Sequence, residues 1–465
     1  MEQGADVWKK AQDLHFAERF PEAEAIYDQI LAQNLKHAGL LASMGTLYLQ
    51  TGKPGLAALL LHQAVEHGRK GKKAFCPSDV LSNLGLAYKM SGLHDKARFW
   101  LEKAVQMPDA SPESIAHYGA TFIEDDEESA LKYLNKAIAQ KPDHWIAHWN
   151  LSIALLSSGN WKKGWQEHEY GMRTKQRIDR ALGGKPRWKG PEVHPGATVA
   201  IYGEQGIGDE IMFATMICDV LKTNKVVIEC HQRLVTIFQK AFPGVPVYGT
   251  REEADAPEWT KTEAFDYQIS MGSLGQFYRN RREDFPGTPY LKAEPLASGE
   301  KFRVGISWTG GQKAGRVRKR TVPLSWWKSI LDVPNVEFVS LQYTDAQEEI
   351  DLVNALGHDV KVMDEYVKAH DYYETARLVQ SCDLVITVCT SVVHLAGALG
   401  VPCWVMTPKA PAWRYQNSGP MPWYRSVRLY RKPGADSDAW LPVIEKVAED
   451  LVAKVAERGL GQRAA

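Results

Sequence analysis

Residues 84–108 read LGLAYKMSGLHDKARFWLEKAVQMP, and the spacing of apolar and small residues in this stretch predicts two helices joined by a short turn. A Leu-Gly pair is followed one turn later by an aromatic residue, and two alanines of the second helix lie where the helices would touch. The positions that carry the pattern are Leu84, Gly85, Tyr88, Ala97, Leu101, Ala104 and Pro108. A hairpin of this size cannot bury its apolar face alone, so the stretch predicts neighbouring copies of itself.

The same spacing recurs about every 34 residues in the first part of the chain, which is the period of tetratricopeptide repeats. The copies comprise Leu14, Ala23, Tyr27 and Ile30, then Met44, Gly45, Tyr48, Ala57, Leu61 and Ala64, then Tyr118, Gly119, Phe122, Ala130, Leu134, Ala137 and Pro142, and finally Leu151, Leu155 and Gly164. We therefore predict an array of about five repeats over residues 1–175, stacked into a superhelix whose concave surface binds a protein segment. The alternative is that the array only supports the rest of the chain.

The composition argues against several classes of function. The 465 residues contain 56 Lys and Arg against 56 Asp and Glu, which leaves no global charge to attract nucleic acid or an anionic membrane. No apolar stretch has the length of a membrane span and the first residues lack a secretory signal, so we expect a cytoplasmic protein. The six cysteines show no C-x-x-C spacing, which argues against a zinc ribbon or a disulfide framework.

After a Pro- and Gly-rich linker at residues 176–195, short apolar runs alternate with helical stretches. Expected strands lie at 198–202, 225–230, 245–248 and 267–269, and then at 302–308, 336–341, 360–363, 384–388 and 403–406. Expected helices lie at 210–221, 234–242, 325–331, 345–356, 373–381 and 391–399. This alternation predicts two doubly wound parallel-sheet domains, residues 196–295 and 301–432, and then a C-terminal helix and tail at 436–465. The fold class is therefore α plus α/β, with a ligand cleft at the carboxyl ends of the two sheets.

A glycine-rich turn, GEQGIGDE at residues 203–210, follows the first expected strand and precedes a helix. Gly206 and Gly208 allow a ligand to approach the backbone closely, and the helix N-terminus offers unpaired N–H groups. The order of the glycines matches neither the dinucleotide fingerprint nor a Walker loop, so neither a nicotinamide cofactor nor an NTPase is favoured. Taken alone, Asp209 is equally well explained as a cap of the following helix.

A second strand-turn-helix motif, TVCTSVVHLAGALG, occupies residues 387–400. Thr390 or Ser391 can cap the helix, and His394 lies one turn inside it on the side that faces the turn. The arrangement fits a diphosphate at the helix N-terminus. An ordinary capped helix with a histidine in the core is the alternative.

A third motif, SWTGGQKAGRVRKR at residues 307–320, carries the densest positive charge of the chain. It begins at a strand end with Trp308 and includes Lys313 and Arg320. Several cations directed at a cleft would neutralise the charge that develops on a pyrophosphate leaving group. The alternative is a loop whose charges are simply solvated.

Together these motifs resemble bacterial tetratricopeptide proteins that carry a GT-B glycosyltransferase domain. The resemblance covers about residues 4–432 and rests on GEQGIGDE, SWTGG with its basic residues, Val339-Ser340-Leu341-Gln342, TSxxHLAGALGVP, Trp413-Arg414 and Pro422-Trp423-Tyr424. The α/β domains are similar to the ADP-heptose:lipopolysaccharide heptosyltransferase family and more distantly to the O-linked N-acetylglucosamine transferases. Among proteins that join both parts, the nearest are flagellin glycosyltransferases that use a nonulosonic acid such as pseudaminic acid.

The resemblance implies roles for individual residues. It places Asp209 at the position proposed as catalytic base in heptosyltransferases, and it places Thr390, Ser391 and His394 where the donor diphosphate is held. Lys313 corresponds less securely to a basic residue of the donor loop. One position departs from the family, because Cys389 stands where an Asp usually precedes the Thr-Ser pair. If that Asp mainly braces the turn, Cys costs little, whereas a role in donor binding would imply another sugar nucleotide or lost activity here.

We expect an enzyme that transfers a sugar from a nucleotide sugar, held mainly by residues 301–432, to a protein acceptor such as flagellin recruited by the repeats. No D-x-D motif is present, so helix dipole, hydroxyl groups and cations replace a metal ion, and no cofactor is expected. Asp209 is the expected base. The expected donor contacts are Gly206, Gly208, Trp308, Lys313, Arg320, Gln342, Tyr343, Thr390, Ser391 and His394, of which Gln342 and Tyr343 would contact the nucleoside.

Three alternatives remain at this stage. A non-catalytic adaptor would use the repeats alone and keep the α/β domains as a vestigial fold. A transferase could act on a glycan or lipopolysaccharide acceptor instead of a protein. A sugar-nucleotide epimerase would need further carboxylates in the cleft and would have no use for the repeat array.

Overall fold

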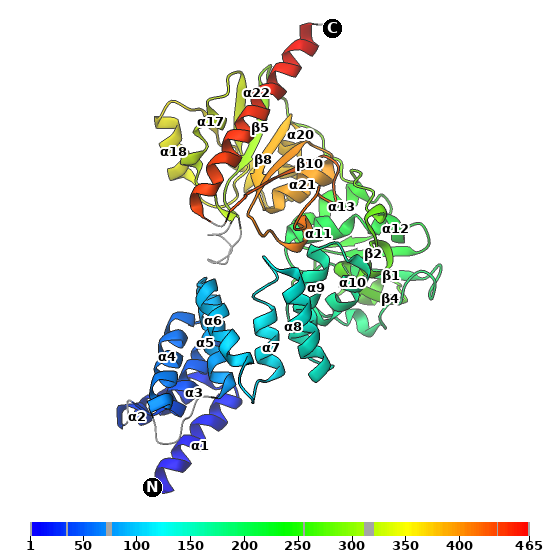
Figure 1. Cartoon of the computed structure of the whole chain (residues 1–465). Helices are drawn as coiled ribbons and strands as arrows, with labels where there is room; N and C mark the ends of the chain where they lie inside the picture. Colours follow the sequence, from blue (N-terminus) through cyan, green and yellow to red (C-terminus); the bar gives the residue numbers. More distant parts are fainter. Residues whose placement is uncertain are drawn as a thin grey trace. The chain divides into compact units, whose positions relative to one another are not determined.

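The computed structural model describes residues 2–33, 36–70, 77–253, 256–310, 320–434 and 436–463. The chain divides into two compact units, Met1–Ala154 and Leu155–Ala465, which are considered separately below (Figure 1). The division falls within helix α9, Trp145–Ser157. The expected repeat boundary at residue 175 lies beyond this division, because the last repeat helix, α10, packs into the second unit.

The first unit consists of successive helical hairpins. Its helices are α1 (Glu2–Phe16), α2 (Phe20–Gln33), α3 (Ala38–Gln50), α4 (Pro54–Lys70), α5 (Ser78–Met90), α6 (His94–Val105), α7 (Pro112–Gly119), α8 (Glu127–Gln140) and the first part of α9. The alanine and leucine positions of the second helix of each hairpin are buried, as Ala97 and Leu101 illustrate. This arrangement confirms the tetratricopeptide repeats predicted from the spacing.

Close packing of the two helices explains why a small residue occupies the position of Gly85 and Gly45 in the repeats. A Cβ atom added at Gly85 would lie 2.5 Å from Leu101 Cγ and 3.1 Å from the Ala97 carbonyl oxygen. Gly45 lies equally close to Leu61, with 2.5 Å between an added Cβ atom and Leu61 Cγ. The paired helices therefore approach each other at a distance that only glycine permits.

This close approach predicts the effect of an added methyl group. Gly85→Ala is expected to destabilise the first unit by about 1–2 kcal/mol, because overpacking against buried Leu101 outweighs the gain in helix propensity. Gly55→Ala is the control, since an added Cβ atom there meets nothing within 4 Å in helix α4 and should stabilise by up to about 1 kcal/mol. Urea unfolding measures both. Equal effects of the two substitutions would contradict the packing argument.

The second unit contains two parallel sheets. The first has the strand order β3-β2-β1-β4 and the second the order β10-β9-β8-β5-β6-β7. The first set is β1 (Thr198–Tyr202), β2 (Lys225–Glu229), β3 (Val247–Tyr248) and β4 (Tyr267–Ser270). The second set is β5 (Phe302–Ser307), β6 (Val336–Ser340), β7 (Val360–Lys361), β8 (Leu384–Val388), β9 (Cys403–Thr407) and β10 (Val427–Arg431). All pairs of neighbouring strands run parallel, as the alternating pattern predicted.

Helices precede, connect and follow these strands. In the first half they are α10 (Trp161–His168), α11 (Ile207–Ala214), α12 (Ile217–Val220), α13 (Val235–Ala241), α14 (Trp259–Thr262) and α15 (Gly275–Tyr278). In the second half they are α17 (Lys328–Leu331), α18 (Gln347–Ala355), α19 (Asp364–Val367), α20 (Tyr372–Gln380), α21 (Ser391–Leu399) and α22 (Leu441–Arg463). None of the described helices has both the length and the apolar character needed to span a membrane.

Several elements differ from the sequence-based expectation. The helix expected at 210–221 starts earlier and is broken at Thr215, whose hydroxyl donates to the Met212 carbonyl. Strand β10 was not expected, because its Arg and half-exposed positions weaken the apolar signal of an edge strand. The final helix starts at Leu441 and not at 436.

The segment at 176–195 is packed into the second unit and does not behave as a linker. The Arg177 side chain is fully buried, and Trp188 is 1% exposed. The Trp188 N–H donates to the Gln268 carbonyl at 2.9 Å, which ties the segment to strand β4. Its Pro and Gly content is typical of a linker, but the segment packs along the first sheet.

Candidate active site

Two of the motifs singled out in the sequence lie against each other in the second unit. Helix α11 follows strand β1 and helix α21 follows strand β8, and the two helices pack together (Figure 1). A Cβ atom added at Gly208 would lie 3.0 Å from Ser391 Cα and 3.2 Å from His394 Cδ2. Gly208 is therefore required for the contact between these helices, and it brings the carboxyl ends of β1 and β8 to one place.

The N-terminus of α21 is capped by its own motif. Thr390 is the N-cap, and its hydroxyl accepts from the Val392 N–H at 3.2 Å. The Ser391 hydroxyl accepts from the Tyr372 hydroxyl at 3.3 Å. The remaining N–H groups of the first turn and the helix dipole favour an anion at this end of the helix.

His394 lies one turn into α21 and is 3% exposed. Its Nδ1 atom has no hydrogen-bond partner within the described part of the chain. Burial lowers the pKa of His394 well below its usual range, and the charges of Arg414 and Arg320 act in the same direction. The imidazole is therefore neutral at physiological pH, with one nitrogen left for a ligand.

Cys389 directly follows β8 in the turn to α21 and is 2% exposed. Burial raises the pKa of its thiol to about 11, so it carries no charge. Its carbonyl oxygen accepts from Arg320 Nη1 at 3.5 Å. The buried thiol is small and uncharged, while Arg320 lies next to the helix N-terminus.

Asp209 forms an ion pair with Arg414, which belongs to the short turn Trp413–Tyr415. The two residues are 205 positions apart in sequence. The other carboxylate oxygen of Asp209 accepts from the Gly206 N–H at 3.3 Å, so Asp209 braces the first turn of α11 from inside the helix. Both side chains are partly exposed, 19% for Asp209 and 15% for Arg414.

The glycine-rich turn between β1 and α11 is fixed by buried charges. Arg177 Nη2 donates to Glu204 Oε1 at 2.7 Å and to the hydroxyls of Ser270 and Ser273 at 2.7 and 2.8 Å. Gln205 has a φ of 63°, a backbone conformation that costs energy for a residue other than glycine. Arg177 was missed from the sequence because it lies in the segment interpreted as a linker.

Glu210 supports the same turn from inside α11. Arg251 forms an ion pair with Glu210, and its Nη1 donates to the Gln205 carbonyl at 2.7 Å. The Glu210 carboxylate also accepts from the His231 N–H at 2.9 Å. Burial raises the pKa of Glu210 to about 7, although Arg251 opposes this shift.

The raised pKa of Glu210 predicts a pH dependence of stability. The folded protein holds a proton on Glu210 that the unfolded chain loses near its ordinary pKa, so this stabilisation is lost as the pH rises toward 7. The free energy of unfolding of the wild type relative to Glu210→Gln should fall by about 2–4 kcal/mol between pH 5 and pH 8. Urea unfolding followed by tryptophan fluorescence at several pH values tests this. A difference that grows with pH would instead assign the larger effect to the ion pair with Arg251.

Two residues that we expected to contact the donor, Trp308 and Gln342, instead make contacts within the protein. Trp308 is fully buried in the core of the second sheet, and its Nε1 donates to Glu349 Oε2 at 2.8 Å. Gln342 Oε1 accepts from the Ser307 hydroxyl at 3.1 Å and from two backbone N–H groups at 3.2 Å, and Gln342 Nε2 donates to the Thr309 carbonyl at 3.1 Å. The amide of Gln342 therefore braces the loop after β5 and is not available to a nucleoside.

The other predicted positions are placed as follows. Arg320 lies next to Cys389, and Tyr343 is half-buried directly after Gln342. Lys313 and most of the basic loop lie outside the described residues. No cluster of three or more His, Cys, Asp or Glu side chains that could hold a metal ion occurs in the described ranges.

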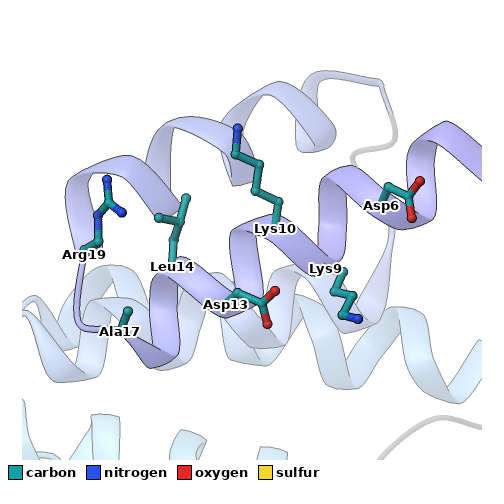
Figure 2. Close-up of a pocket in the computed structure, with 7 residues that line it drawn as sticks. All are labelled: Asp6, Lys9, Lys10, Asp13, Leu14, Ala17 and Arg19. Carbon is teal, nitrogen blue, oxygen red and sulfur yellow. The ribbon is translucent and has the colours of Figure 1, made fainter.

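Two cavities lie away from these residues. One, of about 470 Å³, is a surface hollow on helix α1 and the turn after it, lined by Asp6, Lys9, Lys10, Asp13, Leu14, Ala17 and Arg19 (Figure 2). The other, of about 370 Å³, lies in the second unit and is lined by residues of α12 and of the stretch from Arg279 to Tyr290, with Trp423. Neither cavity is lined by a predicted site residue.

Comparisons with known proteins agree with the repeats. Residues 128–164 match the tetratricopeptide repeat family. The chain is 29% identical over 327 residues to Protein FlbA of Caulobacter vibrioides, and the alignment covers 64% of this chain and 53% of that protein. The chain thus spans about half the length of this curated relative.

Among solved structures, the chain is similar to the following two proteins over part of its length. The type IV pilus biogenesis factor PilW is 12% identical with a TM-score of 0.35, covering 48% of this chain and 87% of that chain. YrrB, a tetratricopeptide protein with an unusual peptide-binding site, is 19% identical with a TM-score of 0.29, covering 37% of this chain and 85% of that chain.

Proposed function

We propose that this chain is a GT-B glycosyltransferase that moves a sugar from a nucleotide sugar to a protein acceptor held by the tetratricopeptide repeats. The observation that carries the proposal is the meeting of two helix N-termini, those of α11 and α21, at the carboxyl ends of two parallel sheets. Ligands of doubly wound folds bind at this edge. The resemblance of both motifs to heptosyltransferases points the same way.

The donor phosphate would lie at the N-terminus of α21. Its first-turn N–H groups, the hydroxyls of Thr390 and Ser391, the buried imidazole of His394 and the guanidinium of Arg320 supply donors and positive charge. Asp209 would take the proton from the acceptor hydroxyl as the bond to the sugar forms. These groups stabilise the departing phosphate without a metal ion in this proposal.

In this proposal the tetratricopeptide repeats bind the acceptor. Tetratricopeptide arrays bind protein segments on their concave surface, and the first unit of this chain consists of such repeats. The acceptor class is therefore a protein, with flagellin and a nonulosonic acid donor as the pair suggested by the sequence resemblance. Such transfer would take place in the cytoplasm, where nucleotide sugars are made.

A thermal-shift panel of CMP, UDP, GDP and ADP tests donor binding. A nucleotide that binds only the folded protein stabilises it by about 2.7 kcal/mol at about 100 times Kd, so one member should raise the Tm. Ser391→Asp should abolish the shift, because its carboxylate competes with phosphate while still favouring the helix dipole. Gln347→Asp adds the same charge at the start of α18 and should leave the shift intact. A Tm unmoved by all four nucleotides would contradict the proposal.

The adaptor alternative is favoured by two observations. Both oxygens of Asp209 already have partners, and Cys389 replaces a carboxylate with a neutral buried thiol. A protein that binds its partner through the repeats and binds no nucleotide would be such an adaptor. A transferase with a glycan or lipopolysaccharide acceptor would bind nucleotide but modify no protein.

A further inference from the structure

We propose that Arg414 is a catalytic cation that alternates between two anions, namely Asp209 in the empty site and the phosphate of the donor in the loaded site. The inference rests on the proposed transfer reaction and assigns a residue and an order of binding to it. It starts from the ion pair between Arg414 and Asp209, which ties together the two halves of the second unit.

In the structure, both carboxylate oxygens of Asp209 already have partners. One carboxylate oxygen is paired with Arg414, and the other accepts from the Gly206 N–H at 3.3 Å. A general base must contact the proton that it removes, at roughly 2.6–3.2 Å between heavy atoms. The Gly206 contact is long and belongs to the helix turn, so the oxygen that becomes available is the one held by Arg414.

Arg414 has unused donor capacity. A guanidinium has five N–H donors, and the pair with Asp209 is its one ion pair within the described ranges. Its Nε atom is buried and lacks a partner among the described residues. Buried donors of this kind are normally satisfied, so the arrangement points to an acceptor that is supplied by a ligand.

The surroundings of Arg414 are rich in positive charge. Arg320 lies at the Cys389 carbonyl and α21 directs its N-terminus to the same place, whereas Asp209 supplies the matching negative charge. Arg431 is committed to backbone, since it donates to the carbonyls of Tyr415, Gln416 and Gly419 at 2.8–2.9 Å. A phosphate entering at α21 would therefore compete directly with Asp209 for Arg414.

The backbone that carries Arg414 is held in place. Trp413 is buried and packs against Trp165, with 5.4 Å between ring centroids. Arg431 fixes the carbonyls of Tyr415 and Gln416 on the other side of the turn. The exchange is thus a rotation of the Arg414 side chain and needs no movement of a domain.

The exchange of Arg414 between Asp209 and the donor phosphate sets the order in which donor and acceptor bind. The donor binds first and draws Arg414 away, which frees the Asp209 oxygen for the acceptor hydroxyl. The acceptor oxygen then forms its bond to the sugar carbon as the bond from that carbon to the phosphate oxygen breaks. The hydroxyl proton passes to Asp209, and the electron pair of the broken bond stays on the phosphate beside Arg414. Asp209 then gives this proton to solvent, and release of the nucleotide returns Arg414 to the Asp209 carboxylate.

Calorimetric titration of the full chain with inorganic pyrophosphate tests the competition. Arg414→Gln should weaken binding about 10-fold, and Asp209→Asn should tighten it about 10-fold by releasing Arg414. In the Arg414→Gln background, Asp209→Asn should change the affinity less than about 2-fold, since no competition remains. Asp219→Asn breaks a comparable ion pair, with Arg279, and should leave the affinity unchanged.

Two outcomes overturn the inference. An equal gain from Asp209→Asn in both backgrounds would mean simple charge repulsion between Asp209 and pyrophosphate, without Arg414. Wild-type affinity in both Arg414→Gln and Arg414→Lys would remove Arg414 from the phosphate site, and Arg414→Lys covers the case in which the glutamine variant folds poorly. A wild-type chain that binds neither pyrophosphate nor any of the four nucleotides would instead refute the proposed transferase.

Discussion

Asp209→Asn is expected to lower turnover by about 100-fold or more, because the amide cannot accept the proton of the acceptor hydroxyl. The substitution keeps the size of the side chain and its contact with the Gly206 N–H, so helix α11 should remain capped. Turnover is measured by mass spectrometry of the modified acceptor, with the nucleotide sugar that the binding panel identifies. Nucleotide binding should survive, which separates loss of the base from loss of the fold.

The matched control for this substitution is Asp219→Asn. Asp219 pairs with Arg279 in the same half of the unit and is 18% exposed, close to the 19% of Asp209. The control removes an ion pair whose arginine is more deeply buried than Arg414, and because it lies away from the proposed site it should leave turnover within a few-fold of the wild type. Similar turnover in both variants would reduce Asp209 to a helix cap and an ion-pair partner.

The secondary structure around the candidate site was predictable where local sequence determines it. Strand β8 and helix α21 have the bounds that the sequence predicts, because a buried strand, a Thr cap and a C-terminal Gly400 with a φ of 78° all leave local signals. The strand before the glycine-rich turn was also placed correctly. Parallel pairing places each motif at the carboxyl edge of its own sheet, and the packing of α11 against α21 then brings the two edges together.

The ion pairs of the site were not predictable, because their partners are far apart in sequence. Arg414 is 205 residues from Asp209, and Arg177 is 27 residues from Glu204. Neither arginine has a local pattern that distinguishes it from a solvated one. The prediction that Trp308 contacts the donor was wrong. A residue at a strand end faces either the cleft or the core, and Trp308 faces the core.

A truncated protein that begins at residue 176 is expected to be unfolded, whereas one that begins at residue 143 is expected to fold. The longer form keeps α10, whose Trp165 is buried against Gly275 and donates to the Arg279 carbonyl at 2.7 Å. The shorter form loses Trp165 and also Glu169, an ion-pair partner of buried Arg177. Loss of one buried Trp costs about 3–5 kcal/mol, and the loss of one of the two carboxylate partners of Arg177 adds to this cost.

Those costs together approach the whole stability of a typical domain, about 5–15 kcal/mol, which is why folding and not only binding should fail. Thermal unfolding followed by circular dichroism distinguishes the two forms, and equal melting temperatures would show that α10 is dispensable.

The form that begins at residue 143 lacks most of the repeats but retains Asp209, His394 and Arg414. It should bind nucleotide as the full chain does and fail to modify the protein acceptor, because it lacks the repeats that we propose recruit the acceptor. Undiminished modification by this form would make the first unit a support and place acceptor recognition within the second unit.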